Sequence, residues 1–219
     1  MKPQHLSSEL AFYKDAFSDN RTRRERKYSW MQNPSRTVVE LAETNGLDGD
    51  TQNKRVLDLG CGDGRHSEHF LSLGYQVVGV DFCEEAVEIC TLRFEGRDAN
   101  FHVLDLTQRG SLSELGQFDV VIDWSVLDHV RSEYLPAYIA NIYDAISKKG
   151  HLFLTAFTDS LPGLFKNKRY KVVNGHYSRG YTVDKLVGLF PGLKLVDERE
   201  NVLEDEINDY RFHTILMRK

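Results

Sequence analysis

The chain has 219 residues, of which 41% are hydrophobic and 28% charged, and its formal net charge is −5 at pH 7. This length fits one α/β domain with a sizeable core and leaves no room for a second catalytic domain. The negative charge argues against a protein that works by neutralising a phosphate backbone, so nucleic acid is not the expected partner.

Cysteine usage and hydropathy predict where the protein works. Cys61, Cys83 and Cys90 form no C-x-x-C pair, which is typical of a reduced protein and predicts a cytoplasmic location. The amino terminus lacks a basic start followed by an apolar stretch, and no run approaches the roughly 18 apolar residues of a membrane span. No membrane segment is therefore expected. The sequence does not indicate the oligomeric state.

The first 30 residues mix charged and aromatic side chains. The basic run over residues 21–27 is interpreted as a solvated helix face or loop flank rather than a phosphate contact. The aromatic residues either line the substrate side of a cleft or bury the segment against the core, and both interpretations stay open. The candidates for the substrate side are Tyr13, Phe17, Tyr28 and Trp30. We predict an N-terminal helical lid or cap within residues 1–50, followed by the main domain over residues 51–219.

Further along the chain, strand and helix patterns alternate after a helix that opens at Asn33 and Pro34 and ends at Gly46. Strands are predicted over 54–59, 75–80, 100–104, 118–123, 151–157, 193–201 and 211–217, and helices over 65–73, 84–95, 134–146 and 182–190, with a loop or short helix at 111–115. Such alternation predicts a parallel, doubly wound sheet. Residues 158–180 are expected to be irregular and, being long, functional.

Residues 56–64 read V-L-D-L-G-C-G-D-G, an apolar run that breaks into alternating glycines and then into a helical pattern. This predicts a strand, a tight turn and a helix whose free N–H groups face a ligand. Asp81, about 20 positions later at the tip of the next strand, suits the two hydroxyls of a ribose. Arg65 stands where dinucleotide enzymes have a third glycine, and Asp58 would repel phosphate but orient a cationic amino group. The loop therefore favours an amino acid joined to a nucleoside.

V-L-D-L-G-C-G-D-G, then G-V-D-F, then V-L-D-L resemble the motifs of the class I S-adenosylmethionine-dependent methyltransferases. The resemblance implies a Rossmann-like, doubly wound sheet of seven strands, mostly parallel with an antiparallel last strand, and S-adenosylmethionine as cofactor. It implies that residues 58–64 hold the methionine part, Asp81 the ribose, Phe82 the adenine face, and Asp105 with Leu106 the adenine amino edge. The cofactor-binding candidates are Asp58, Gly60, Cys61, Gly62, Asp81, Phe82, Asp105, Leu106 and Asp123.

The segment after the fourth strand is where this family places its substrate. Methyl transfer is an in-line displacement that needs an oriented acceptor and a dry site, and a general base helps when the acceptor carries a proton. His129 and Asp128 are the candidate catalytic residues, although a packed or solvated His129 is an equally open interpretation. Further substrate-side candidates are Trp124, His176 and Tyr177.

His66 and His69 have the spacing of a metal pair but lack a third ligand nearby, so no metal is predicted. The chain also lacks the Asn/Asp-Pro-Pro-Tyr/Phe motif of amino-methylating DNA and protein-glutamine enzymes and the Pro-Cys of cytosine-C5 enzymes. We therefore expect a methyltransferase for a small molecule. The alternatives are a tRNA or protein methyltransferase and a non-catalytic regulator that binds the cofactor.

Overall fold

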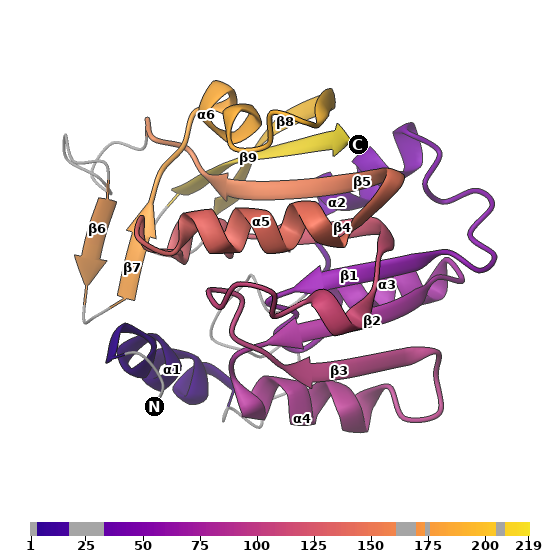
Figure 1. Cartoon of the computed structure of the whole chain (residues 1–219), viewed down its shortest axis with the longest axis horizontal. Helices are drawn as coiled ribbons and strands as arrows, with labels where there is room; N and C mark the ends of the chain where they lie inside the picture. Colours follow the sequence, from indigo (N-terminus) through magenta and orange to yellow (C-terminus); the bar gives the residue numbers. More distant parts are fainter. Residues whose placement is uncertain (1–3, 18–32, 161–169, 174–175, 205–208) are drawn as a thin grey trace.

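The computed structural model describes residues 4–17, 33–160, 170–173, 176–204 and 209–219. The chain forms a seven-stranded sheet in the order β3-β2-β1-β4-β5-β9-β8, with helices on both faces (Figure 1). Its strands are β1 (Arg55–Leu59), β2 (Gln76–Asp81), β3 (Ala99–Val103), β4 (Phe118–Trp124), β5 (Ile146–Phe157), β8 (Lys194–Glu204) and β9 (Asp209–Arg218).

Strands β1 to β5 run parallel, and β9 is antiparallel to both β5 and β8. The predicted Rossmann-like sheet of seven strands with an antiparallel last strand is thereby confirmed. Because the carboxyl ends of β1, β2 and β4 meet at one edge, the residues that follow these strands lie near one another.

The helices are α1 (Gln4–Phe17), α2 (Arg36–Thr44), α3 (Arg65–Ser72), α4 (Glu84–Arg93), α5 (Leu135–Ala145) and α6 (Val183–Gly188), with short 3-10 helices η3 (Ser113–Leu115) and η4 (Leu127–His129). No helix in these described ranges is both long and apolar enough to cross a membrane.

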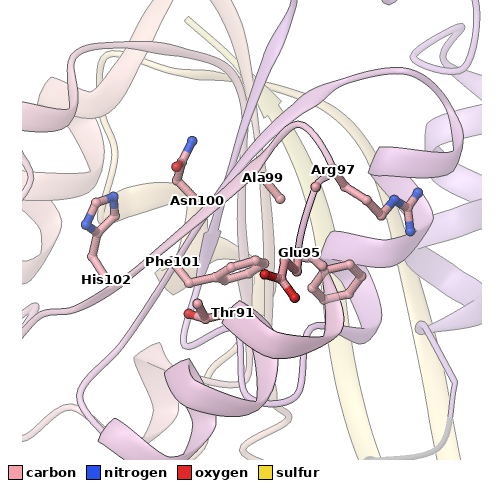
Figure 2. Close-up of a pocket in the computed structure, with 9 residues that line it drawn as sticks. Thr91, Glu95, Arg97, Ala99, Asn100, Phe101 and His102 are labelled. Atoms are coloured by element: carbon pink, nitrogen blue, oxygen red, sulfur yellow. The ribbon is translucent and has the colours of Figure 1, made fainter.

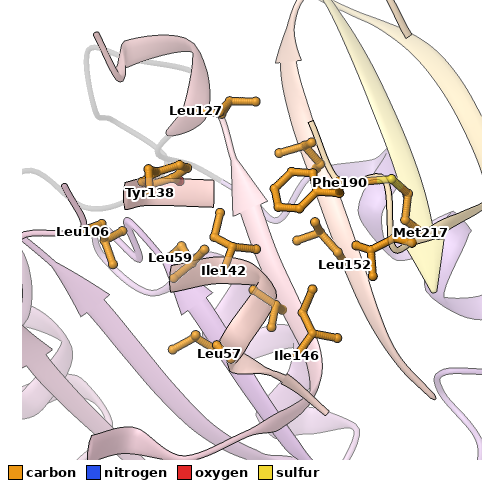
Figure 3. Close-up of a cluster of buried hydrophobic side chains, with 14 of the residues drawn as sticks. Leu57, Leu59, Leu106, Leu127, Tyr138, Ile142, Ile146, Leu152, Phe190 and Met217 are labelled. Carbon is orange, nitrogen blue, oxygen red and sulfur yellow. The ribbon is translucent and has the colours of Figure 1, made fainter. Parts of the chain in front are cut away.

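Two hydrophobic clusters, one on each face of the sheet, form the core. Neighbouring residues of β1 point to opposite faces: Val56 belongs to the cluster that includes residues of α2 and α3, whereas Leu57 belongs to the cluster that includes Tyr138 and Ile142 of α5 (Figure 3). Strands buried on both faces explain the continuous apolar runs in the sequence.

The structure corrects the boundary between the predicted helix over residues 134–146 and the following strand, which was predicted to begin at His151. Strand β5 instead begins at Ile146, directly after α5. Its pairing with β4 shifts register between Phe118 and Val120, and Lys149 has a φ of 70°. A bulge therefore takes up the polar residues that resembled a turn.

The stretch over residues 158–180 also holds more regular structure than predicted. Its described part includes an antiparallel hairpin of β6 (Tyr170–Val173) and β7 (His176–Arg179). Tyr181 then joins the sheet through a bridge to Thr158. The hairpin lies beside α1 (Figure 1).

A shallow hollow of about 260 Å³ opens at the outer edge of the sheet, between β3 and the end of α4 (Figure 2). Phe101 stacks on Phe94 beneath it, with ring centroids 5.4 Å apart. None of the residues predicted to bind cofactor or substrate lines this hollow. The predicted cofactor-binding residues lie instead at the carboxyl ends of the strands.

Candidate active site at the carboxyl ends of the strands

The turn between β1 and α3 has room only for glycine at two positions. Gly60 and Gly64 have φ values of 59° and 79°, which other residues rarely adopt. A Cβ atom on Gly60 would come within 2.5 Å of Val126, and one on Gly64 within 2.5 Å of Phe94. The bare backbone of this turn is thus required by the packing beneath it.

Asp58, at the end of β1, ties the strand to the first turn of α3. Its Oδ2 accepts hydrogen bonds from the Ser67 backbone N–H at 3.0 Å and from the Ser67 hydroxyl at 2.6 Å. Burial raises the pKa of the Asp58 carboxyl to about 6, partly opposed by these bonds. Cys61 contributes its backbone, whose N–H donates to the Val80 carbonyl at 3.0 Å.

Asp81, at the tip of β2, accepts hydrogen bonds from two backbone N–H groups. The Gly62 N–H lies 3.0 Å from Oδ2 and the Cys83 N–H lies 2.9 Å from Oδ1. Burial raises the pKa of Asp81 to about 6. Each carboxylate oxygen can accept a further bond, so Asp81 holds the glycine turn and keeps acceptor capacity toward a ligand. Phe82 follows it and meets the ring edge of Tyr13.

Asp105 and Leu106 lie directly beyond β3. The Leu104 N–H donates to the Asp81 carbonyl at 2.8 Å, which sets this segment beside the end of β2. Oδ1 of Asp105 accepts from the backbone and hydroxyl of Thr107 at 2.9 and 2.6 Å. The buried Leu106 is fixed through its carbonyl by Asn141 of α5.

A turn after β4 presents Asp128 and His129. Ser125 has a φ of 59° and donates from its hydroxyl to Oδ2 of Asp128 at 2.9 Å. Oδ1 of the fully buried Asp128 has no hydrogen-bond partner in the described part of the chain and lies 4.0 Å from Nε2 of His129. Burial raises the pKa of Asp128, while the nearby His129 opposes the shift.

The imidazole of His129 is held by groups from several elements. Its Nδ1 lies 2.7 Å from the carbonyl oxygen of Tyr177, and its ring lies 4.4 Å from the ring of His176. Phe157 meets it edge-on at 6.0 Å. Burial lowers the pKa of His129, so the ring stays neutral to a lower pH than an exposed histidine.

Helix α1 covers both the glycine turn with the end of β2 and the hairpin beside His129. Phe17, 5% exposed, has a ring carbon 3.2 Å from the point where a Cβ on Gly62 would sit. Tyr13 lies between Phe82 and His176, with ring centroids 5.7 and 5.9 Å away. The aromatic side chains of α1 therefore contact the glycine turn, the end of β2 and the hairpin together.

Comparisons with known proteins identify the family of this chain. The family model described as "Methyltransferase domain" matches residues 22–191. The chain belongs to this methyltransferase family. An uncharacterized methyltransferase of Schizosaccharomyces pombe is 30% identical over 125 residues, which are 56% of this chain and 81% of that protein. The ubiquinone biosynthesis O-methyltransferase of Glaesserella parasuis is 30% identical over 130 residues, or 57% of this chain and 52% of that protein.

Solved structures share the fold of this methyltransferase. A S-adenosylmethionine-dependent methyltransferase from Anabaena variabilis superposes with a TM-score of 0.76 at 15% identity, covering 99% of this chain and 96% of that one. The 1,6-didemethyltoxoflavin-N1-methyltransferase of Burkholderia thailandensis gives 0.72 at 19% identity, covering 99% and 89%.

The structure brings most of the predicted site residues of the methyltransferase to one edge of the sheet. Trp124 ends β4 with the Arg65 guanidinium 3.9 Å above its ring and Phe212 at 5.4 Å. Tyr28 and Trp30 lie outside the described residues. His66 accepts from the Ser35 backbone N–H at 3.1 Å, and no group of three or more metal-binding side chains occurs in the described ranges.

Three contacts of the site, made by Glu9 and Phe12 of α1, were not predicted from the sequence. Glu9 of α1 binds His176 and Tyr177 of β7, and Phe12 stacks on His176 with ring centroids 4.7 Å apart. Helix α1 lies outside the matched residues 22–191, and no motif marks its residues. The only signal was the gathering of aromatic and charged side chains in the first 30 residues.

Asp123 is enclosed by protein groups. Its Oδ1 accepts from the Val126 and Leu127 N–H groups at 2.9 and 3.2 Å, and its Oδ2 accepts from the Tyr138 hydroxyl at 2.8 Å. Burial raises the pKa of Asp123 to about 7. These contacts fix the turn that carries His129. The cofactor-binding role of Asp123 stays a prediction.

An Asp123→Asn variant is expected to be more stable than wild type at pH 8, by about 1 to 2 kcal/mol, because the buried charge is removed. In the variant, the side-chain amide oxygen can accept from the Val126 and Leu127 N–H groups, while the amide NH₂ donates to the hydroxyl oxygen of Tyr138. Since the folded-state pKa is raised, wild type loses stability as pH rises from about 4 to 7, and the advantage should vanish near pH 4. Urea unfolding at both pH values measures this. Equal stabilities at pH 8 would contradict it.

Proposed function

We propose that this methyltransferase transfers the methyl group of S-adenosylmethionine to a small-molecule acceptor, in the cytoplasm. The observation that carries the proposal is the convergence of a glycine turn, the buried Asp81 carboxylate and the oriented His129 at one sheet edge. By their names, one relative reported above is an O-methyltransferase of ubiquinone biosynthesis and one solved structure is a methyltransferase of 1,6-didemethyltoxoflavin, which supports a small acceptor. Cys61, Cys83 and Cys90 are all free, as a reducing compartment requires.

The residues present fit the cofactor. The turn at residues 60–64 follows β1 with Gly60, Gly62 and Gly64 at positive φ, and Asp81 beside it retains acceptor capacity for ribose hydroxyls. We assign residues 58–62 to the methionine part, Asp81 to the ribose, Phe82 to the adenine face, and Asp105 with Leu106 to its amino edge. The bound cofactor supplies an electrophilic methyl group on a sulfonium.

The chain itself has three tasks in this reaction. The end of β4 and the hairpin position the acceptor, and α1 excludes water above it. His129 removes the acceptor's proton through Nε2, because Nδ1 is engaged by the Tyr177 carbonyl. Asp128, whose Oδ1 lies 4.0 Å from Nε2, favours the charged imidazole that results.

Labelled S-adenosylmethionine incubated with the protein and a size-fractionated cell extract tests the proposal. Label in small molecules is expected. Label in RNA or protein would instead support the macromolecular alternative, and no transfer would support a non-catalytic regulator.

Helix α1 is the part of the predicted 1–50 segment that we propose as a lid. Helix α2, within the same segment, buries Val38 and Leu41 in the core. Hydrogen exchange of α1 amides should slow when S-adenosylhomocysteine is added, because Phe17 and Tyr13 lie over the cofactor residues. The α2 amides serve as the internal control. Equal α1 protection with and without the ligand would show a fixed cap.

A further inference from the structure

Glu9 is a buried carboxylate, 5% exposed, that joins α1 to β7. Its Oε1 accepts from the Tyr177 N–H at 2.7 Å, and its Oε2 lies 2.5 Å from Nδ1 of His176. A carboxylate this deeply buried is costly unless both oxygens are hydrogen-bonded, and here both are. The position lies outside the residues matched by the family model.

Tyr177 connects Glu9 to His129. The N–H of Tyr177 donates to Glu9, and the carbonyl of the same residue lies 2.7 Å from Nδ1 of His129. Tyr177 is itself 5% exposed, so neither contact competes readily with water. The position of the Tyr177 carbonyl, and hence the orientation of the imidazole, depends on Glu9.

The Tyr177 carbonyl also determines the tautomer of His129. A carbonyl oxygen only accepts, so Nδ1 must carry the proton, and in the neutral ring Nε2 then has the lone pair. The charged or titratable groups facing His129 are Asp128 of η4, His176 of β7 and Glu9 of α1. Nε2 is the nitrogen on the Asp128 side.

We infer that Glu9 is a positioning residue: by holding Tyr177 and His176 it keeps His129 in the Nδ1-protonated tautomer and makes the base competent only when α1 is docked. This inference rests on the proposed function, in which His129 takes the acceptor's proton. It assigns the N-terminal helix a part in the chemistry besides covering the site.

The tautomer can be measured without an acceptor. Long-range ¹H–¹⁵N correlation spectra at pH 8 distinguish the two neutral imidazole forms, and the loss of signals in His129→Gln assigns those of His129. Wild type should show protonated Nδ1. Glu9→Ala should give a mixture of both tautomers, whereas Glu9→Gln should restore the wild-type form, because its amide oxygen can still accept from Tyr177.

Lys14→Ala is the matched control on the same helix, because Lys14 pairs with Glu85 of α4 at 2.6 Å and contacts nothing on β7 in the described interactions. It should keep the wild-type tautomer. An unchanged tautomer in Glu9→Ala would overturn the inference, and so would an equal change in Lys14→Ala, since docking alone would then be responsible.

Kinetics separate positioning from folding. With labelled S-adenosylmethionine at saturation and the small-molecule fraction of the extract, Glu9→Ala should lower the single-turnover rate about tenfold or more, part of the contribution of a general base. Cofactor affinity should stay within about twofold, and Glu9→Gln should recover the rate. No transfer by wild type would refute the proposed function, whereas a full rate in Glu9→Ala would refute only the role of Glu9.

Discussion

A His129→Gln variant is expected to transfer methyl groups about 10² to 10⁴ times more slowly than wild type in single turnovers, the range typical of a lost general base. Glutamine can still donate a hydrogen bond to the Tyr177 carbonyl, which accepts from His129 at 2.7 Å in the wild type. It has no group that takes a proton at neutral pH. The chemical step should therefore slow while the segment stays folded, and kcat and kcat/KM should fall together.

The pH dependence gives an independent check on His129. Burial lowers the pKa of this imidazole, so the wild-type rate should remain on its plateau below the pH at which exposed histidines become charged. At lower pH the rate should fall as the ring protonates. His129→Gln should lack this transition and should bind S-adenosylhomocysteine as wild type does. An unaltered single-turnover rate would remove His129 from the mechanism.

Asp81→Ala is expected to weaken the binding of both S-adenosylmethionine and S-adenosylhomocysteine by roughly 1.5 to 3 kcal/mol, the scale for losing a charged hydrogen-bond acceptor. Two effects act in the same direction. The ribose hydroxyls lose their acceptor, and the Gly62 N–H, which donates to Asp81 at 3.0 Å, loses the group that fixes the glycine turn. Titration calorimetry measures both affinities.

Asp119→Ala is a matched control, because Asp119 also accepts a backbone hydrogen bond, from the Arg55 N–H at 2.9 Å, but at the start of β1. It should leave cofactor affinity unchanged. Failure of wild type to bind either ligand would refute the cofactor assignment itself. A loss of affinity in Asp119→Ala equal to that in Asp81→Ala would show a general effect on folding.

The sheet and the turn that joins β1 to α3 were predictable because their signals are local. The glycine turn follows its strand at once, and Asp81 ends the next strand, so a stretch of some 25 residues suffices. The start of β5 was not predictable from the sequence, because residues 146–150 resemble a turn and become strand only by pairing with β4 through a bulge. The local sequence pattern does not indicate which strand a segment will pair with.

The acceptor side could be only partly predicted, because its geometry depends on contacts distant in sequence. His129 and Asp128 follow β4 at the place that the motif order indicates. The partner of Tyr177, however, is Glu9, 168 positions away, and no period or spacing relates them. Asp123 illustrates the same limit, because only the fold shows that Tyr138 encloses it.

Helix α1 contacts both the glycine turn and the β6–β7 hairpin, so access to the cofactor and the orientation of His129 are coupled. The helix that lies against the glycine turn through Phe17 is the one that holds the hairpin through Glu9. In the lid role proposed above for α1, lifting of this helix for cofactor exchange would also release the Tyr177 carbonyl that orients His129. We therefore expect that the active site is either open to solvent or has an oriented His129, but not both at once. The sulfonium of the cofactor would then be exposed to bulk water only while His129 is not oriented as a base.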